Sequence, residues 1–412
     1  MKDKIFKTFR AFQYRNYRLF FSGQIVSLIG SWIQNIAISW LIYEMTKSAF
    51  IMGTVACINA IPLLVMLPFA GVISDKFNKH KLFIWVQVAF AIQAFIMAIL
   101  AMSGIIKIWH IVVLGVMLNL IMAVDMPLRQ AFVIYMVDDK KDLGNAISLN
   151  SSCFNLARLI GPAIAGVLIS AFGVGVCFLI NFVSYLPVIW AVCAMRLPKI
   201  IEEKPEKKGL LKDLKEGLSY AVKSPQISLL LVSLAVLSFV GMSYPIMMPI
   251  FAAEVLHRGA ETLGILMSAA GIGALLASLL LAYKQTVRGL AKILTFSMLV
   301  ASLSFFFMGF SHGMITAFCL MFGVGFGMVM FLISSNTLIQ AIVDDDKRGR
   351  IMSLHAIAFA GTFSLSNMLV GVIAQEFGIS NTFKIVGIVL FISFVYFGNR
   401  LCKTDFKSVV KH

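Results

Sequence analysis

Two ionisable residues lie deep inside apolar stretches of this chain, where an unpaired charge would be costly. Asp125 belongs to the apolar run 108–132 and Arg158 to the run 146–171, and a short polar loop joins the two runs. If both runs are helices, the two residues are equally far from the middle of that loop. They then lie at a similar depth, roughly 15 to 20 Å from the loop end at 1.5 Å per residue. Ionisable residues inside such runs usually mark a pathway for ions or substrate.

The chemistry available to Asp125 is the uptake and release of a proton. Arg158 is one candidate partner, Arg129 lies one turn away on the same helix face, and Lys79 is a third candidate. A buried carboxylate that changes its cationic partner between two states can bind a proton in one state and lose it in the other. We therefore predict a proton-coupling group of Asp125, Arg129 and Arg158. A purely structural ion pair is the alternative.

The composition shows what must position these residues. Hydrophobic residues make up 60% of the chain and charged residues 13%, and the mean hydropathy is +0.92. Soluble domains carry about 25% charged residues, so the solvent of this chain is lipid. Twelve runs are long enough for membrane-spanning helices, and no β-barrel alternation is visible. The predicted spans are 18–43, 50–74, 82–103, 108–132, 146–171, 174–196, 226–252, 261–284, 290–311, 313–340, 351–375 and 380–401.

One long polar interval divides the chain. Residues 196–223 hold eight Lys or Arg and five Asp or Glu. We predict an N-terminal six-helix half at 1–196, a cytoplasmic linker at 197–225 and a C-terminal six-helix half at 226–412. The linker contains an amphipathic pattern that predicts a helix lying along a membrane surface, with its apolar face formed by Leu210, Leu211, Leu214, Leu218 and Tyr220.

The net charge of +16 is mainly a topology signal. Lys and Arg gather at both ends of the chain, in the linker and in alternate loops, and such residues stay on the cytoplasmic side. We predict a multi-pass protein of the plasma or inner membrane with both termini cytoplasmic. Nucleic-acid binding would need the charge on one folded face. The first 18 residues, with six Lys or Arg and one Asp, are interpreted as a retained interfacial segment rather than a signal peptide.

The two halves repeat each other. Nine identities fall in the 35 positions from Gly144 to Phe178 when these are compared with residues 205 positions later. Parallel repeats about an axis along the membrane normal characterise one large class of transporters, which bind substrate near the midplane between the halves. The identical residues are Gly144, Ser148, Leu149, Phe154, Gly166, Val167, Phe172, Gly173 and Phe178, which recur as Gly349, Ser353, Leu354, Phe359, Gly371, Val372, Phe377, Gly378 and Phe383.

The loop after the second predicted span carries a glycine, three further residues, an aspartate and a basic cluster. These are Gly71, Asp75, Lys76 and Lys79, and they resemble motif A of the major facilitator superfamily. The resemblance implies a cytoplasmic gate in which Asp75 faces the positive N-terminus of a neighbouring helix and Lys79 pairs with an acid. Asn78 stands where the family has a glycine, and asparagine is able to adopt the same left-handed turn.

The fifth predicted span resembles motif C, which exporters of that superfamily carry on this helix. Gly161, Pro162 and Gly166 supply a kink and small residues for close helix approach, although the spacing after the proline is one residue longer. The runs 125–133 and 144–150 are similar to the enterobactin-exporter-like branch, also called transmembrane secretion effectors, which grades into macrolide-efflux pumps.

The resemblance implies an all-α major facilitator fold and proton-driven export of a small organic molecule. Gln34, Asn35, Asn155 and Arg158 are the predicted substrate-cavity residues, with membrane lipid, protons and a small molecule as partners. We expect a monomeric transporter, not an enzyme, with no cofactor, metal or nucleic acid. A membrane receptor or lipid-handling protein with the same fold is the alternative, since few acids lie within the spans.

Two further expectations concern the C-terminal half. Phe363 and Asn367 align with Arg158 and Pro162, which predicts a cavity that is polar on the N-terminal half and apolar on the C-terminal half. Prolines in the seventh span predict a flexible outer gate, and Glu254 beyond them is interpreted as solvated.

Overall fold

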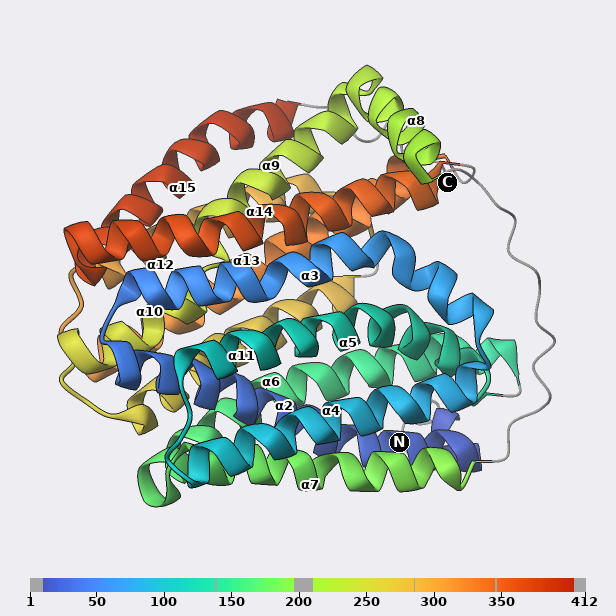
Figure 1. The fold of residues 1–412 in the computed structure, drawn as a ribbon. Coiled ribbons are helices and arrows are strands. Elements are labelled where there is room, and N and C mark those ends of the chain that lie inside the picture. Colours follow the sequence, from blue (N-terminus) through green and yellow to red (C-terminus); the bar gives the residue numbers. More distant parts are fainter. Residues whose placement is uncertain (1–9, 138, 196–209, 285, 345–346, 404–412) are drawn as a thin grey trace, which may run out of the picture. The chain divides into compact units, whose positions relative to one another are not determined.

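The computed structural model describes residues 10–137, 139–195, 210–284, 286–344 and 347–403, and among these the side chains of 67–76, 131, 134, 140, 210–214, 402 and 403 lie outside the description. Twelve spans in this part of the chain are long and apolar enough to cross a membrane, which confirms the predicted number. The first six are α2 (Arg15–Thr46), α3 (Ala49–Lys76), α4 (Lys79–Met102), α5 (Ile108–Ile134), α6 (Leu143–Phe172) and α7 (Val174–Cys193) (Figure 1).

The remaining elements follow the linker. The seventh span is interrupted, because it consists of α9 (Pro225–Gly241), α10 (Tyr244–Ile250) and a π-helical turn, Phe251–Val255. Pro245 and Pro249 lack the backbone N–H that a continuous helix needs at those positions. The last five spans are α11 (Ala260–Lys284), α12 (Leu290–Met308), α13 (Met314–Ile342), α14 (Arg348–Phe377) and α15 (Ile379–Lys403).

The internal repeat is present in the backbone. Helix α14 begins and ends 205 residues after α6. Both helices stop at a glycine in a left-handed conformation, Gly173 with φ 81° and Gly378 with φ 77°, a region that side chains with a Cβ rarely occupy. Helices α7 and α15 begin directly after these glycines, again 205 residues apart. The predicted duplication of six helices is therefore confirmed.

The chain separates into two compact units. One comprises Met1–Leu41 and Ile58–Glu206, and the other comprises Ile42–Cys57 and Lys207–His412. The second unit thus includes the hairpin 42–57, which the sequence division assigns to the N-terminal half. Within this unit the Ser48 Oγ donates to Gln375 Oε1 at 2.9 Å, and a Cβ on Gly53 would lie 3.0 Å from the Cα of Gly371. The small residues allow this close approach.

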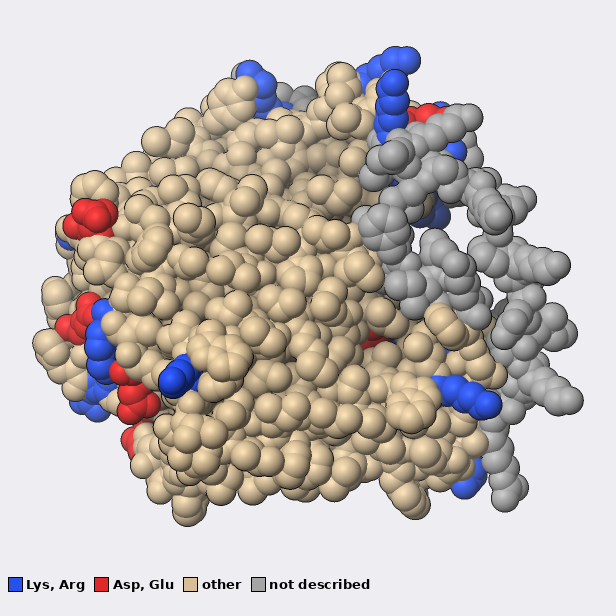
Figure 2. Space-filling model, in the orientation of Figure 1, with Lys and Arg blue, Asp and Glu red and all other residues tan. Residues whose placement is uncertain are grey.

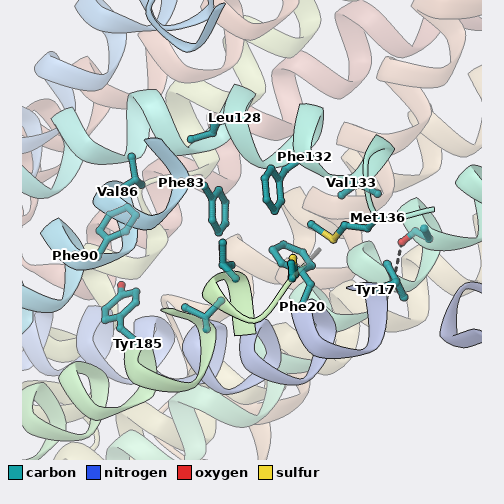
Figure 3. Packing of buried hydrophobic residues seen from close by; sticks show 14 of the residues in the cluster. Tyr17, Phe20, Phe83, Val86, Phe90, Leu128, Phe132, Val133, Met136 and Tyr185 are labelled. Carbon is teal, nitrogen blue, oxygen red and sulfur yellow. Dashed lines mark hydrogen bonds between the residues drawn. The ribbon is translucent and has the colours of Figure 1, made fainter. Parts of the chain in front are cut away.

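The same packing of helices recurs inside each unit. In the first, α4 contacts α5 and α7, and in the second, its counterpart α12 contacts α13 and α15. Figure 3 shows part of the apolar core of the first unit, where the rings of Phe83 and Phe132 stack with centroids 4.9 Å apart. On the face drawn in Figure 2, most charged side chains lie toward the margins of the view and the described surface between them is almost entirely uncharged.

The predicted linker helix is α8 (Leu210–Lys223), which packs on α9 and α14. Gly217 and Ala221 are buried and Tyr220 is half-buried, whereas Leu218 is 55% exposed. Among the side chains expected to form one apolar stripe, those of Leu210, Leu211 and Leu214 lie outside the described residues. The location of α8 at a membrane surface stays a prediction.

Candidate proton and substrate site

Asp125 is buried in the first unit, with 7% of its surface exposed, and both of its carboxylate oxygens accept hydrogen bonds. Arg129, one turn further along α5, donates to Oδ2 through Nε at 3.0 Å and Nη2 at 2.8 Å. Gln87 on α4 donates to Oδ1 at 3.0 Å. Of the three cations considered as partners, the structure therefore pairs Asp125 with Arg129.

Arg158 lies on α6 beside an aromatic pair. Its guanidinium carbon is 6.0 Å from the ring centroid of Trp32 on α2, and the Trp32 ring makes an edge contact with Phe154 at 5.9 Å. Phe154 is 47% exposed. Cations over a tryptophan face are stabilised by the ring quadrupole, so this arrangement places a positive charge next to an accessible apolar surface.

Gly161 explains how α2 and α6 come together at this point. A Cβ on Gly161 would lie 2.5 Å from the Cβ of Trp32, which is well inside van der Waals contact. Pro162 and Gly166 are also buried in α6. The three residues predicted from the motif C resemblance are thus packing residues in this structure, and any part they play in antiport stays a prediction.

The four residues predicted to line the cavity fall into different environments. Gln34 is buried, its Nε2 donates to Gln93 Oε1 at 3.0 Å, and its Oε1 accepts from Asn181 at 2.8 Å. Both ends of its amide are therefore used to join α2, α4 and α7. Asn35, by contrast, is exposed, and Asn155 is half-exposed and donates to Ser151 O at 3.0 Å. Asn35, Asn155 and Arg158 are the members of the set with accessible surface.

The motif A loop is only partly described. The side chains of Gly71, Asp75 and Lys76 lie outside the described residues, so their predicted role in a gate stays a prediction. Lys79 is the first residue of α4, and its Nζ is 5.8 Å from the ring centroid of Tyr135. Asn78 does not use the left-handed turn open to it, because its φ is −58° and its side chain caps α4 by accepting from Lys81 N at 3.1 Å. Asparagine is a favoured residue at a helix N-cap.

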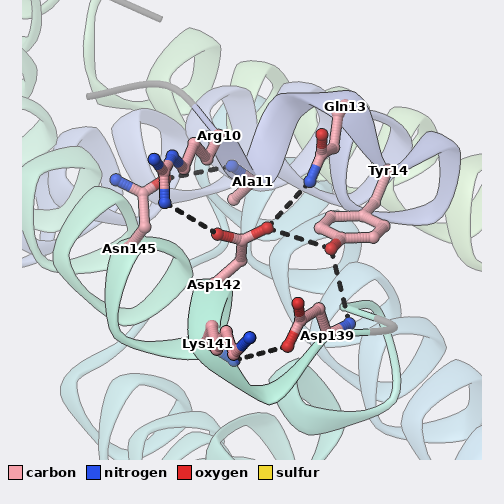
Figure 4. A network of polar contacts seen from close by, with 8 residues as sticks. All are labelled: Arg10, Ala11, Gln13, Tyr14, Asp139, Lys141, Asp142 and Asn145. Carbon is pink, nitrogen blue, oxygen red and sulfur yellow. Dashed lines mark hydrogen bonds and ion pairs between the residues drawn. The ribbon is translucent and has the colours of Figure 1, made fainter. Parts of the chain in front are cut away.

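A polar cluster at the start of α6 was not predicted (Figure 4). Asp142, buried at the N-cap position, accepts from Gln13 Nε2 at 2.8 Å and from the Tyr14 hydroxyl at 3.0 Å, and Arg10 Nη1 lies 4.0 Å from its other oxygen. Burial and the hydrogen bond to Asp142 raise the pKa of Tyr14. The described part of the N-terminal segment is docked on its own half. The sequence signal was the polar and aromatic residues 13–17 within a basic segment.

Glu254 is also engaged. Its Oε1 accepts from the Tyr43 hydroxyl at 3.3 Å within the second unit. Glu254 is exposed, as its interpretation as solvated requires, and it also holds this hydrogen bond. Sequence reasoning missed this contact because Tyr43 and Glu254 are separated by about half of the chain.

Known proteins with a similar architecture are membrane transporters. A bacterial homologue of the human lysosomal transporter Spinster, solved in an inward-facing conformation, superposes with a TM-score of 0.75 at 14% identity over 97% of this chain and 99% of that chain. A bacterial homologue of the iron transporter ferroportin, also inward-facing, gives 0.76 at 14% identity over 95% and 99%. The fold is thus the major facilitator fold, with twelve helices in two pseudo-symmetric halves.

The sequence defines the family more closely. This chain belongs to the transmembrane secretion effectors, whose family model matches residues 6–410. It is 26% identical to the staphyloferrin A transporter of Staphylococcus aureus over 94% of this chain and 97% of that protein. It is 21% identical to macrolide efflux protein A of Streptococcus pyogenes over 91% and 94%. The protein is therefore a major facilitator transporter and not an enzyme.

Proposed function

We propose that this transporter is a proton-coupled exporter of a small amphiphilic organic molecule, such as a drug or siderophore, and that it works by alternating access. The observation that carries the proposal is the buried Asp125, which pairs with a cation inside a membrane-spanning helix of a family of secretion effectors. We further propose that the protein acts as a monomer in the plasma or inner membrane with both termini in the cytoplasm.

The coupling mechanism assigned to Asp125 follows from its contacts. Arg129 and Gln87 together supply donors to both carboxylate oxygens in the described state. A second state that withdrew Arg129 would leave a buried, unpaired carboxylate, which is stabilised by binding a proton. Asp125 would then take up a proton on one side of the membrane when Arg129 withdraws, and release it on the other side when Arg129 returns.

The substrate class is supported by the group around Arg158. A guanidinium binds carboxylates with two parallel hydrogen bonds, and the adjacent Trp32 and Phe154 rings offer apolar contact. Asn35 and Asn155 add uncharged polar side chains. This combination suits a molecule with an acidic group and an apolar body. The alignment of Phe363 with Arg158 agrees with an asymmetric site whose charge comes from the N-terminal half.

We assign the outer closure to the hairpin 42–57, which is non-cytoplasmic in the topology predicted from the charge pattern. Its contacts through Ser48, Gly53 and Tyr43 are the ones we expect to change when the transporter changes state. A receptor or lipid-handling protein would not need these contacts to alternate.

The function is tested with purified protein in liposomes. Staphyloferrin A and a macrolide, which the names of the two relatives suggest, are the first compounds to measure under an imposed pH gradient of either sign. Gradient-dependent accumulation of one of them supports the proposal. If neither these nor a wider panel of siderophores, macrolides and lipophilic cations is moved under any gradient while binding is retained, the receptor alternative replaces it.

A further inference from the structure

Each half of the molecule carries a tyrosine just ahead of its first span, and both tyrosines make the same kind of contact. Tyr14 precedes α2, and its hydroxyl donates to Asp142 Oδ2 at 3.0 Å, immediately before α6. Tyr220 lies in α8, ahead of α9, and its hydroxyl donates to Asp344 Oδ2 at 3.0 Å, shortly before α14. Since α14 is the counterpart of α6, the segment ahead of the first span is docked on the same helix end in both halves.

The ion pairs that accompany the two tyrosines have opposite senses. In the N-terminal half the cation is on the docked segment, because Arg10, four residues before Tyr14, lies 4.0 Å from Asp142. In the C-terminal half the anion is on the docked segment, because Glu216, four residues before Tyr220, is 2.8 Å from Arg350. The positions correspond in the sequence, but the charges are exchanged.

The receiving helix ends show the same inversion. The residue directly before the helix is Asp142 for α6 and Lys347 for α14, and the Lys347 Nζ lies 4.5 Å from the Tyr220 ring centroid. The third helical residue is Asn145 in α6, which accepts from Ala11 N at 3.0 Å, and Arg350 in α14. Both docking sites therefore offer a carboxylate to the tyrosine, but only the second adds cations, Lys347 and Arg350, beside it.

We infer that this charge-inverted pair of docking sites lets each cytoplasmic segment recognise its own half. Arg10 complements Asp142 and, at the other site, would meet the cations Lys347 and Arg350 beside Asp344. Glu216 complements Arg350 and would be repelled by Asp142. Specificity between two similar sites requires unfavourable pairings as well as favourable ones. Glu216, Tyr220, Asp344 and Arg350 are thus positioning residues that keep α8 attached to the second unit throughout the transport cycle.

Close backbone approach supports stable docking of α8. A Cβ on Gly217 would lie 3.2 Å from the Cβ of Arg350, so the helix has no room for a larger residue at its point of contact without displacement. The neighbouring Lys215 is exposed on α8 and supplies a matched control position.

The test is amide hydrogen exchange of the full-length protein in lipid nanodiscs, read on peptides covering 10–17 and 215–223. Glu216→Lys and Arg350→Glu are each expected to speed exchange in 215–223 roughly threefold, because a partly exposed pair changes from attraction to repulsion. The double variant should return to within about 1.5-fold of wild type, and the control Lys215→Glu should leave the rate unchanged.

The recognition itself is tested by exchanging charges between the segments while conserving net charge. Arg10→Glu combined with Glu216→Lys should speed exchange in both peptides, with the larger change in 215–223, because Gln13 and Tyr14 still hold Asp142. Unchanged exchange in Glu216→Lys, no recovery in the double variant, or an unaffected charge-exchanged protein would each overturn the inference. Thermal unfolding of every variant verifies that the fold is intact.

Discussion

Helices α6 and α14 have the same length, the same position in their halves and the same terminal glycine. They differ at positions where α6 carries predicted functional residues. Helix α6 carries Arg158 beside Trp32 and the buried Pro162, whereas α14 has Phe363 and the buried Asn367 at the equivalent positions. Duplication preserved the residues that end the helix and pack it. At these aligned positions one copy carries a cation and the other an aromatic ring, and the proposed cavity takes its charge from the first copy.

The two copies are expected to differ most in ligand binding when the aligned residues Arg158 and Phe363 are each replaced by alanine. Arg158→Ala should weaken binding of an acidic amphiphile such as staphyloferrin A by about tenfold to a hundredfold, since hydrogen bonds to charged groups contribute about 1.5–3 kcal/mol. Phe363→Ala should weaken binding of acidic and neutral compounds alike and by a smaller factor. Equilibrium binding to purified protein measures both. Equal losses for Arg158→Ala on acidic and neutral ligands would contradict the charge asymmetry.

A second comparison concerns two glycines of α6. Gly161→Ala places a Cβ against Trp32 and should reduce stability by about 1–3 kcal/mol, as overpacking does. Gly144→Ala is the matched control, because no atom lies within 4 Å of the added Cβ and alanine favours the helix. Thermal unfolding in detergent distinguishes them. Equal melting temperatures for the two variants would show that α2 and α6 do not pack as described.

A third comparison separates two neighbouring amides on α2. Gln34→Ala should reduce stability by about 1–3 kcal/mol, because it leaves Gln93 and Asn181 without their buried partner. Asn35→Ala should leave stability within about 0.5 kcal/mol of wild type, since the residue is exposed. A change in ligand affinity with Asn35→Ala alone would support its place in the cavity, whereas the reverse pattern would exchange the two roles.

The comparison also shows what sequence could predict. Span number and the duplication follow from apolar run lengths and a 205-residue offset, because lipid imposes a minimum helix length and a repeat retains its glycines. The linker helix follows from its amphipathic pattern. Helix periodicity does not show which neighbour a polar side chain meets inside a bundle. The amide of Gln34 was for that reason assigned to the cavity, although the structure shows it joining three helices.

Contacts between residues far apart in the sequence also could not be predicted. Tyr14 with Asp142 and Tyr43 with Glu254 each depend on the arrangement of several helices, and no local pattern encodes that. The cationic partner of Asp125 also needed the structure. Sequence spacing allowed three cations, and the structure shows Arg129 bound to the carboxylate. At Asn78, the family's usual glycine drew attention to a left-handed turn. Asparagine is also a favoured N-cap residue, and Asn78 caps α4 in the structure.

The central claim, that Asp125 couples transport to protons, is tested most directly by Asp125→Asn in liposomes under a pH gradient. The amide has nearly the same shape, so helix packing is retained, but it cannot ionise to bind and release a proton. We expect the variant to exchange substrate downhill at a rate close to wild type and to lose all gradient-driven accumulation. Accumulation at the wild-type level would contradict the account and show that Asp125 and Arg129 form a structural pair only.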